Sequence, residues 1–558
     1  MLKKDISKNK ALVIAAVFVI IKLILVSNQM IFIMPFSAPI DDDLYFRLAN
    51  SITAGDWLGK YDYLTLSKYP FFAVWLAVVH ALGVPYLLAN QFLWAAVSGV
   101  CAFAFAPIIK KNWHRLGLFL LIFYSPATVA KYTLRVYRDS IFPIFCLLFF
   151  VGLAGFALRY DKKIKQNILW LILSGIGLGT AWITREDGFW LLPYGIVAII
   201  LTGVFILKHK TLSHKALRIF LMSIPFVITI GFVITICSIN NKYYNRFIIS
   251  DFTSKEFKTA YGNMTRLSCR EWNPLVAVPI DVRERMYKEC DCLEGFRYYL
   301  EESAIKNAYS NSDSGEYQSG SFYWALRRCA QELGIYKDAK TAEKFYIELS
   351  EQTEKMCRED ENSLPPRSST TPPIRGEYVP MVLDNVWKST KYVLTWQDMQ
   401  PYEEFSLSDA ATGQIDKWEK YLNESSNYSA LENTAIPYYS EKQMFSYKIL
   451  EGIIWIYRLI VPIGLCFWVA GFVKSFIGFK QLGDKKILAL AVSLGLMLMG
   501  ILRIFIISYM EVSAFNIGIY SMYLGAVYPI LLICCFLGGY LLFDGLSTAT
   551  PAVTKTSI

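Results

Sequence analysis

Long apolar runs alternate with short polar loops in the first part of the chain, and the pattern returns near its C-terminal end. A helix rises 1.5 Å per residue, so roughly 20 apolar residues are needed to cross the hydrocarbon core of a bilayer. Runs of this kind lie at residues 11–34, 88–109, 116–133, 140–158, 167–184, 190–207, 217–238, 448–473, 487–507 and 517–542. The pattern predicts an all-α polytopic membrane protein with about ten transmembrane helices.

The loops between these runs indicate how the chain is oriented. Lys and Arg gather in the segments 110–115, 159–165, 208–215 and 474–486, and a Lys-rich stretch precedes the first run. Because basic loops stay on the cytoplasmic side, we expect a plasma (inner) membrane protein with both termini in the cytoplasm. A crossing by the apolar segment 70–86 would invert every later loop, so we expect that segment to lie at the outer interface.

The composition changes at residue 239, where a polar region of roughly 200 residues begins that is large enough for its own core. Helical patterns at 321–334 and 341–358 precede a Pro/Ser/Thr-rich linker at 363–376. We therefore expect an N-terminal transmembrane catalytic module (1–238, first outer loop 35–87), a mainly helical extracytoplasmic domain (239–447) inserted before the last three helices, and C-terminal transmembrane helices with a cytoplasmic tail (448–558).

Composition narrows the possible partners. Only 18% of the residues are charged, against about 25% in soluble proteins. The net charge of +10 lies mostly in short loops, without the basic helix typical of nucleic-acid binding, so we expect no nucleic-acid partner. Five cysteines fall in 239–447, but Cys290 and Cys292 lack zinc-site spacing and the region has no His. Disulfide pairing there stays open.

Charged residues beside the outer helix ends are the candidates for chemistry, because charge at the membrane boundary is costly. The first outer loop contains the string Asp41-Asp42-Asp43-Leu44-Tyr45. Three adjacent carboxylates repel one another unless a cation lies nearby. The alternative is that they only decorate a helix N-terminus, where Asp is favoured.

The second outer loop carries cations against the positive-inside trend. Arg135 and Arg138 precede Asp139 and the helix that begins near Ser140. The planar guanidinium group binds phosphate oxygens in pairs, so a lipid phosphate is one explanation for these arginines. Asp139 could instead be a simple helix cap.

The third outer loop is Arg185-Glu186-Asp187, and a late arginine, Arg503, lies near the outer end of its own predicted helix. The loop could be a self-satisfied Arg–carboxylate turn, and Arg503 could merely extend to the interface. Together, the loops suggest that carboxylates and cations have separate roles in sugar transfer. A carboxylate would orient or deprotonate the acceptor, and cations would stabilise the leaving phosphate.

These motifs resemble those of the GT-C superfamily of membrane glycosyltransferases, which includes oligosaccharyltransferases, protein O-mannosyltransferases and lipid A aminoarabinose transferases. The first-loop string with Ala54-Gly55 is similar to the family's Asp-Glu…Tyr…Ala…Gly pattern. Lys68-Tyr69-Pro70 matches its Lys-Pro stretch before a juxtamembrane helix. Val136-Tyr137-Arg138-Asp139-Ser140 places Asp139 at its second acidic position, and Arg503 with Tyr528-Pro529 resembles its late helices.

The resemblance implies transfer of a sugar, with inversion, from a polyprenyl-phosphate donor to a cell-surface glycan, lipid or protein acceptor on the outer face. It implies that the catalytic residues are Asp41 (as base), Asp42 and Asp139, that Arg135, Arg138 and Arg503 bind the donor phosphate, and that Lys68, Tyr45, Arg185, Glu186 and Asp187 bind substrate. Either no cofactor is required, or a divalent cation (Mg or Mn) is bound, in which case Asp41 and Asp139 are its candidate ligands.

The sequence departs from the family in two places and leaves two alternatives. No Trp-Trp-Asp run occurs, which argues against transfer of a whole oligosaccharide, and Ile141 stands where a further acidic residue would support a metal.

A transporter or flippase of lipid-linked glycans is one alternative function, although transporters usually show internal symmetry and broken helices at mid-membrane. A surface-polysaccharide polymerase or ligase is the other.

Overall fold

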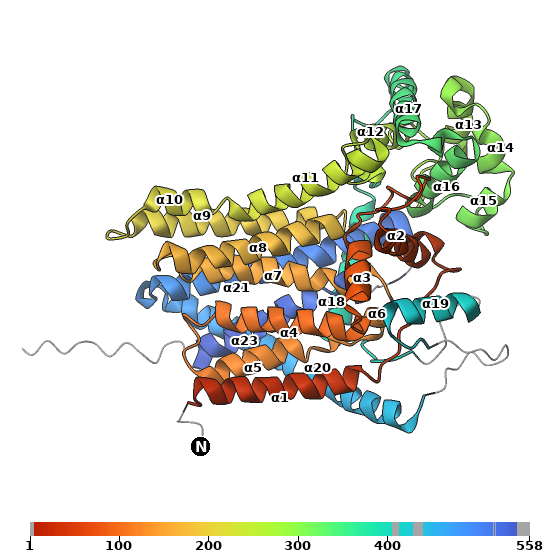
Figure 1. The fold of residues 1–558 in the computed structure, drawn as a ribbon. Helices are drawn as coiled ribbons and strands as arrows, with labels where there is room; N and C mark the ends of the chain where they lie inside the picture. The colour runs from red at the N-terminus through yellow and green to blue at the C-terminus, as the bar shows by residue number, and fades with distance from the viewer. Residues whose placement is uncertain (1–4, 404–411, 428–438, 517, 519–520, 544–558) are drawn as a thin grey trace, which may run out of the picture.

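The computed structural model describes residues 5–403, 412–427, 439–516, 518 and 521–543. Helices make up the ordered elements of this part of the chain, and its only β pairings are isolated bridges. Most of the long helices lie side by side in one bundle, and a group of shorter helices covers one end of it (Figure 1). The fold is therefore an all-α polytopic membrane fold, as the hydrophobic pattern predicts.

Eight helical segments within the described ranges are long and apolar enough to cross a membrane. Their main helices are α1 (Lys8–Val26), α4 (Tyr86–Ala104), α7 (Phe142–Ala157), α8 (Ile164–Thr184), α9 (Leu192–Lys208), α11 (Ile224–Tyr244), which follows α10 (Lys215–Leu221), α20 (Glu441–Ile477) and α21 (Asp484–Met510). The two remaining predicted runs are α5 (Asn112–Phe123), bent by 55° to the segment Pro126–Leu134, and the shorter α23 (Val527–Phe543). Each predicted run thus corresponds to an apolar helix.

Helix α7 forms the centre of the bundle, and all of its residues are buried. It packs closely on α8 through glycines: a Cβ at Gly177 would lie 2.4 Å from the backbone nitrogen of Phe149. Close approach of small residues is the usual basis of helix packing in membranes, where lipid provides no hydrophobic drive. This tight pair carries the second and third outer loops, at the N-terminal end of α7 and the C-terminal end of α8.

The bend after α5 frees backbone groups inside the membrane, and Lys22 of α1 compensates for this. Its Nζ donates to the carbonyl oxygen of Phe123 and, at 2.6 Å, to Oγ1 of Thr128. Lys22 is buried, and buried membrane cations need such partners. The ammonium group therefore fixes the bent segment that leads into the second outer loop.

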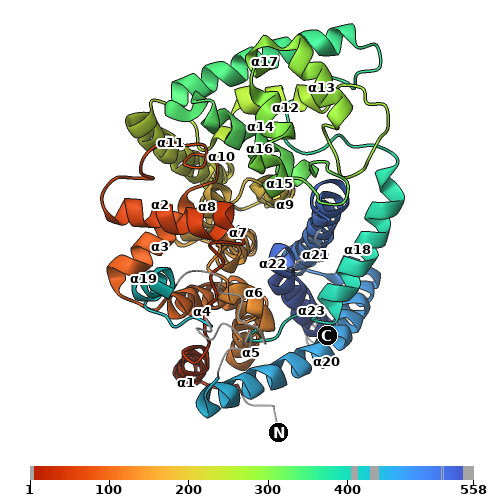
Figure 2. The ribbon, with the colours of Figure 1, turned by 90° about the vertical axis from the view of Figure 1, so that its right-hand side faces the viewer.

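Three short helices run across the bundle axis at the end that carries the three loops predicted to be outer, which we call the outer end: α2 (Leu44–Thr53), α3 (Phe71–Leu82) and α18 (Tyr378–Leu394) (Figures 1 and 2). Helix α3 contains 12 residues and ends at Gly83, whose φ of 64° lies in the left-handed region that glycine adopts readily. The segment 70–86 therefore does not continue through the bundle, in agreement with the sequence.

A compact group of helices follows α11: α12 (Lys255–Met264), α13 (Ile280–Glu289), α14 (Phe296–Glu301), α15 (Ala304–Tyr309), α16 (Ser319–Glu332) and α17 (Ala339–Glu359). They surround their own hydrophobic core, which also takes in Tyr63 of the first outer loop. Nε of Arg327 donates to the carbonyl of Tyr63 at 2.9 Å, and the backbone nitrogen of Asp251 donates to the carbonyl of Leu66 at 2.7 Å. This group of helices, α12 to α17, which we call the outer domain, thus holds in place the loop that leads to Lys68.

The remainder of the predicted 239–447 region packs on the bundle side instead. Helix α18 contacts α21, and α19 (Thr412–Leu422) contacts α3. The ring of Trp418 stacks on Phe46 of α2 with 4.0 Å between centroids. These elements cover part of the outer end of the bundle.

The four basic loops lie at the end of the bundle opposite the outer domain, as does the start of α1 (Figure 1). At that end Lys474 donates to the carbonyl of Leu542 at 2.7 Å. This is the arrangement of loops that the charge pattern predicts. The assignment of that end to the cytoplasm stays a prediction.

Replacing Lys22 by Met removes the ammonium donor from two buried acceptors, which should lower the free energy of unfolding by about 1–3 kcal/mol. We expect a lower apparent Tm in detergent for Lys22→Met. The matched control is Lys8→Met, because Lys8 is exposed at the start of the same helix. An equal Tm for the two variants would show that the bent segment does not need Lys22.

Burial raises the pKa of Glu424 from 4.5 to about 8, although the N–H of Leu87 opposes this shift. The folded state therefore keeps a proton that the unfolded chain releases, and the resulting stability is present in full below pH 4.5 and lost as pH rises through about 8. We expect the apparent Tm to fall from pH 5 to 9 more steeply in the wild type than in Glu424→Gln, measured in matched buffers. Parallel curves would contradict this.

Candidate active site

A cavity of about 1130 Å³ lies at the outer end of the bundle, between the bundle, the outer domain and α18. All three outer loops singled out in the sequence contribute to it. Its floor contains Asp41, Lys68, Tyr137, Arg138, Arg185, Glu186, Asp187 and Tyr523. Tertiary structure thus brings together residues that are far apart in sequence.

Asp41 lies in a π-helical turn, Pro39–Asp43, that runs directly into α2. Its carboxylate pairs with the ammonium group of Lys68, and Oδ1 accepts a hydrogen bond from the hydroxyl of Tyr137 at 3.0 Å. The Asp41 side chain remains 30% exposed. It is therefore held in a defined position and is still accessible from the cavity.

Asp42 faces the other way, because consecutive residues of a helical turn point in different directions. Its side chain is fully buried. Oδ1 accepts from Nε and Nη2 of Arg135 at 2.9 and 2.6 Å, and Oδ2 accepts from the backbone nitrogen of Met34 at 3.2 Å. This pair joins the first and second outer loops beneath the cavity.

Lys68 is enclosed by aromatic rings. Its Nζ lies 5.6 Å, 5.2 Å and 5.7 Å from the ring centroids of Tyr45, Tyr137 and Trp324, which is within cation–π range. Burial lowers the pKa of the Lys68 amino group, and the nearby Arg138 adds to this. Trp324 comes from α16, so the outer domain completes the enclosure.

Arg138 links the second and third outer loops. Its Nη1 donates to both carboxylate oxygens of Glu186, at 3.0 and 2.7 Å, and to the hydroxyl of Tyr45 at 3.3 Å. Glu186 also accepts from the backbone nitrogen of Tyr69 at 3.2 Å. Nε of Arg138 is buried and has no hydrogen-bond partner within the described residues.

Asp187 pairs with two arginines, one from its own loop and one from α21. Arg185 donates to its two oxygens at 3.0 and 3.1 Å, and Nη1 of Arg503 donates to Oδ2 at 2.5 Å. Burial raises the pKa of Asp187, but the two guanidinium groups outweigh burial and hold that pKa well below its usual range. Arg185 also donates to Asp139, so the third loop is tied to both the second loop and α21.

The five acidic and five basic residues just described balance in formal charge: Asp41, Asp42, Asp139, Glu186 and Asp187 against Lys68, Arg135, Arg138, Arg185 and Arg503. Among these ten residues, two polar atoms besides Arg138 Nε are buried without a partner in the described chain, Oδ2 of Asp139 and Nη2 of Arg503. No cluster of three or more metal-ligating side chains occurs among the described residues, and both candidate metal ligands, Asp41 and Asp139, pair with cations.

The predicted site residues thus fall into two sets. Asp41, Lys68, Arg138, Arg185, Glu186 and Asp187 line the cavity. Asp42, Tyr45, Arg135, Asp139 and Arg503 do not line it. Tyr45, Asp139 and Arg503 bond to lining residues, Arg135 lies 3.7 Å from Asp41, and Asp42 bonds to Arg135. Sequence reasoning missed Trp324, Tyr523 and the segment 367–375. Tyr137 was present in the quoted second-loop motif without a role.

Comparisons with known proteins add little. The sequence matches no protein-family model and no curated protein. Among solved structures, the chain resembles ArnT from Cupriavidus metallidurans bound to undecaprenyl phosphate, with 13% identity over 95% of this chain and 77% of that chain. It also resembles the apo state of that protein, with 15% identity over 96% and 78%. Both TM-scores are 0.30, and a likeness at this level carries no argument about function.

Replacing Asp187 by Asn leaves Arg503 buried without its carboxylate, which should cost about 3–5 kcal/mol of stability. Asp384→Asn serves as the control, because Asp384 pairs with Lys388 on the surface, where the two side chains are 60% and 59% exposed. We expect a clearly lower apparent Tm for Asp187→Asn than for Asp384→Asn. Equal melting curves would show that the junction at Asp187 does not stabilise the site.

Proposed function

We propose that the chain is a GT-C-type glycosyltransferase of the plasma membrane that moves one sugar from a polyprenyl-phosphate donor to an acceptor on the outer face. One observation carries the proposal. Of the three consecutive aspartates, Asp41 lines the large cavity, next to arginines that could bind phosphate. This is the arrangement that a carboxylate base and an anionic leaving group require.

The walls of the cavity favour a donor with a lipid tail. Toward the membrane the cavity is lined by Leu502, Phe505 and Ile506 of α21 and by Val379 and Leu383 of α18. Phe505, Val379 and Leu383 are also exposed on the molecular surface. A ligand with a polar head could therefore keep its head in the cavity while its chain extends into lipid.

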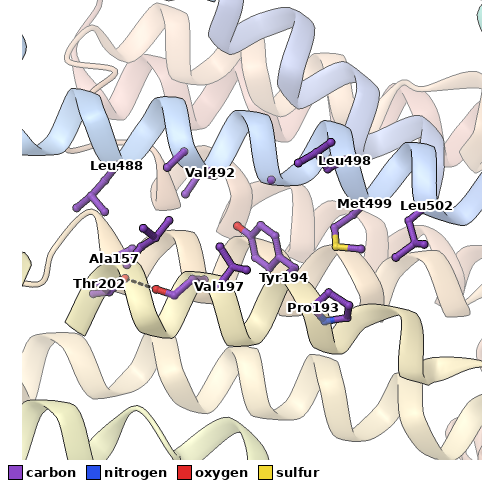
Figure 3. A pocket seen from close by; sticks show the side chains of 14 residues that line it. Ala157, Pro193, Tyr194, Val197, Thr202, Leu488, Val492, Leu498, Met499 and Leu502 are labelled. Carbon is purple, nitrogen blue, oxygen red and sulfur yellow. Dashed lines mark hydrogen bonds between the residues drawn. The ribbon is translucent and has the colours of Figure 1, made fainter. Parts of the chain in front are cut away.

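A second, apolar pocket of about 220 Å³ lies between α9 and α21 (Figure 3). Leu502 lines both this pocket and the cavity. Val197 and Leu498 line the pocket as well and are more than half exposed on the outside of the bundle. An isoprenoid chain is apolar along its whole length, and this pocket offers it a hydrophobic path from the cavity.

The chemistry follows from the pairing of Asp41 with Lys68. An incoming donor phosphate competes for the Lys68 ammonium group, which leaves the Asp41 carboxylate to accept a proton from the acceptor hydroxyl. The acceptor oxygen then bonds to the anomeric carbon, the bond from that carbon to the phosphate oxygen breaks, and the polyprenyl phosphate leaves with the electron pair. Arg138, which lines the cavity, stabilises the phosphate charge as it develops.

The remaining predicted residues act as supports in this proposal. Asp42 neutralises Arg135 and holds the first and second loops in a fixed position relative to each other. Asp139 and Asp187 do the same for Arg185 and Arg503. Asp41 is thus proposed as the base, and Asp42 and Asp139 as positioning residues. No step in this scheme requires a divalent cation.

The first test is consumption of radiolabelled polyprenyl-phosphate sugars by the full chain in proteoliposomes with a crude envelope acceptor. We expect one donor of the panel to be consumed by the wild type, and Asp41→Asn to reduce that rate by about 10²–10⁴-fold, the usual contribution of a general base. Asp43→Asn is the matched control. Asp43 is the neighbour in the same turn, does not line the cavity and bonds to Gln414, so it should keep near wild-type activity.

Three results would contradict the proposal. Equal loss in Asp41→Asn and Asp43→Asn would show that the turn is merely structural. Full activity in Asp41→Asn would exclude it as the base. If no donor is consumed but a labelled lipid-linked glycan changes leaflet, the chain is a transporter.

A further inference from the structure

The wall of the cavity opposite its floor comes from the outer domain and differs from the floor in chemistry. It consists largely of hydroxyl and cationic side chains: Thr253, Lys258, Tyr309, Ser321 and the segment 367–375, which reads Arg-Ser-Ser-Thr-Thr-Pro-Pro-Ile-Arg. Hydroxyl groups both donate and accept hydrogen bonds, and they suit the hydroxyls of a glycan. This wall belongs to the inserted domain rather than to the bundle.

Three cations of this wall lack carboxylate partners. Lys258, Arg367 and Arg375 form no ion pair with any residue in the described ranges, and each is half-buried. Nη1 of Arg367 donates to the hydroxyl of Thr265 at 3.1 Å, and the Arg375 guanidinium lies 5.9 Å from the ring centroid of Trp272. Neither contact supplies negative charge.

The floor provides the contrast. Lys68, Arg138 and Arg185 each pair with a carboxylate there, so the floor is neutral. One carboxylate, Glu511, lines the cavity on the wall's side from the end of α21, and its Oε1 accepts from the backbone nitrogen of Gly518 at 2.5 Å. Among the described residues, three cations against this single acid leave the wall with an excess of positive charge.

The segment 367–375 is held in place by close packing. A Cβ on Gly262 of α12 would lie 2.5 Å from the carbonyl oxygen of Arg367, and the hydroxyl of Tyr509 donates to the carbonyl of Pro372 at 2.8 Å. The first contact joins the segment to the outer domain and the second joins it to α21. The cations therefore occupy fixed positions in the cavity wall.

We propose that this wall binds the acceptor and selects one that carries negative charge, namely a glycan bearing phosphate or carboxylate groups. Half-buried cations without partners are attracted to anions more strongly than paired ones, because no internal carboxylate has to be displaced. That the bound glycan is the acceptor of the reaction rests on the proposed function. The anion site itself stands on the unpaired cations and can be tested without turnover.

The test measures equilibrium binding of three probes to the full chain in nanodiscs: an oligosaccharide, the same oligosaccharide with one phosphate monoester, and the same one with one uronic acid. We expect the charged probes to bind at least about tenfold more tightly than the neutral one, and less tightly as salt increases. Lys258→Gln and Arg375→Gln should each weaken charged-probe binding by about five- to tenfold, the loss of one charge-assisted contact. Neither should change binding of the neutral probe.

Two controls separate this site from the rest of the molecule. Lys255→Gln changes an exposed lysine one turn earlier on α12 and should leave all probes unaffected. Binding of polyprenyl phosphate alone should be unchanged in Lys258→Gln and Arg375→Gln. For Arg367, which also supports its own segment, Arg367→Lys should retain more charged-probe binding than Arg367→Gln.

Equal binding of charged and neutral probes would overturn the proposal, and so would no binding of any probe. Loss of polyprenyl phosphate binding in the wall variants would overturn it as well, because the wall would then belong to the donor. If charged probes bind as expected but Asp41→Asn loses no activity, the anion site stands and the proposed function fails. Whichever of the phosphate probe and the uronic acid probe binds more tightly identifies the anion that the wall prefers.

Discussion

The outer end of this protein depends on one constraint: ten charged side chains lie close together at a membrane boundary, and their charges cancel only when every segment is in place. Removing a charge from water costs several kcal/mol, which is recovered only through close pairing and hydrogen bonds. Asp42 needs Arg135 of the second loop, and Asp187 needs Arg503 of a distant helix. The ion pairs therefore assemble the three outer loops as one unit.

The same constraint determines what the site can do with a ligand. Every cation of the floor already has a carboxylate, so an anionic group can enter only by displacing one or by using a donor that is still unused. Lys68 is the side chain best placed for displacement, because it sits between Asp41 and an aromatic enclosure. The unpaired Nε of Arg138 is buried, so displacement at Lys68 is the route that the geometry favours. In the proposed mechanism, donor binding and activation of the Asp41 base are thereby coupled through a single ammonium group.

The cavity also joins two environments. Toward the membrane it meets exposed apolar residues of α18 and α21, and Leu502 connects it to an apolar pocket between two spanning helices. Toward the outer domain it meets hydroxyl groups and cations without partners. A molecule that carries a polar head on a hydrocarbon chain fits the first side, and a charged glycan fits the second. Their meeting point is the floor that contains Asp41.

The sequence by itself determined the helices and the location of the charged loops. Apolar runs of sufficient length must form helices in lipid, since every backbone group has to be satisfied within the segment. Residues 70–86 were too short and too constrained by the loop charges to span, and α3 lies across the bundle accordingly. The same local pattern identified Asp41, Lys68, Arg138 and the third loop as site candidates.

Only the tertiary structure decided which of these residues face the cavity and which support it. Asp41 and Asp42 are adjacent and chemically identical, and a local turn sends one to the cavity and the other to Arg135. Asp187 and Arg503 are 316 positions apart, and segment 367–375 forms a wall only because Gly262 lets it approach α12. Charge pairing and packing act through space, and a linear pattern does not contain distances between segments that are remote along the chain.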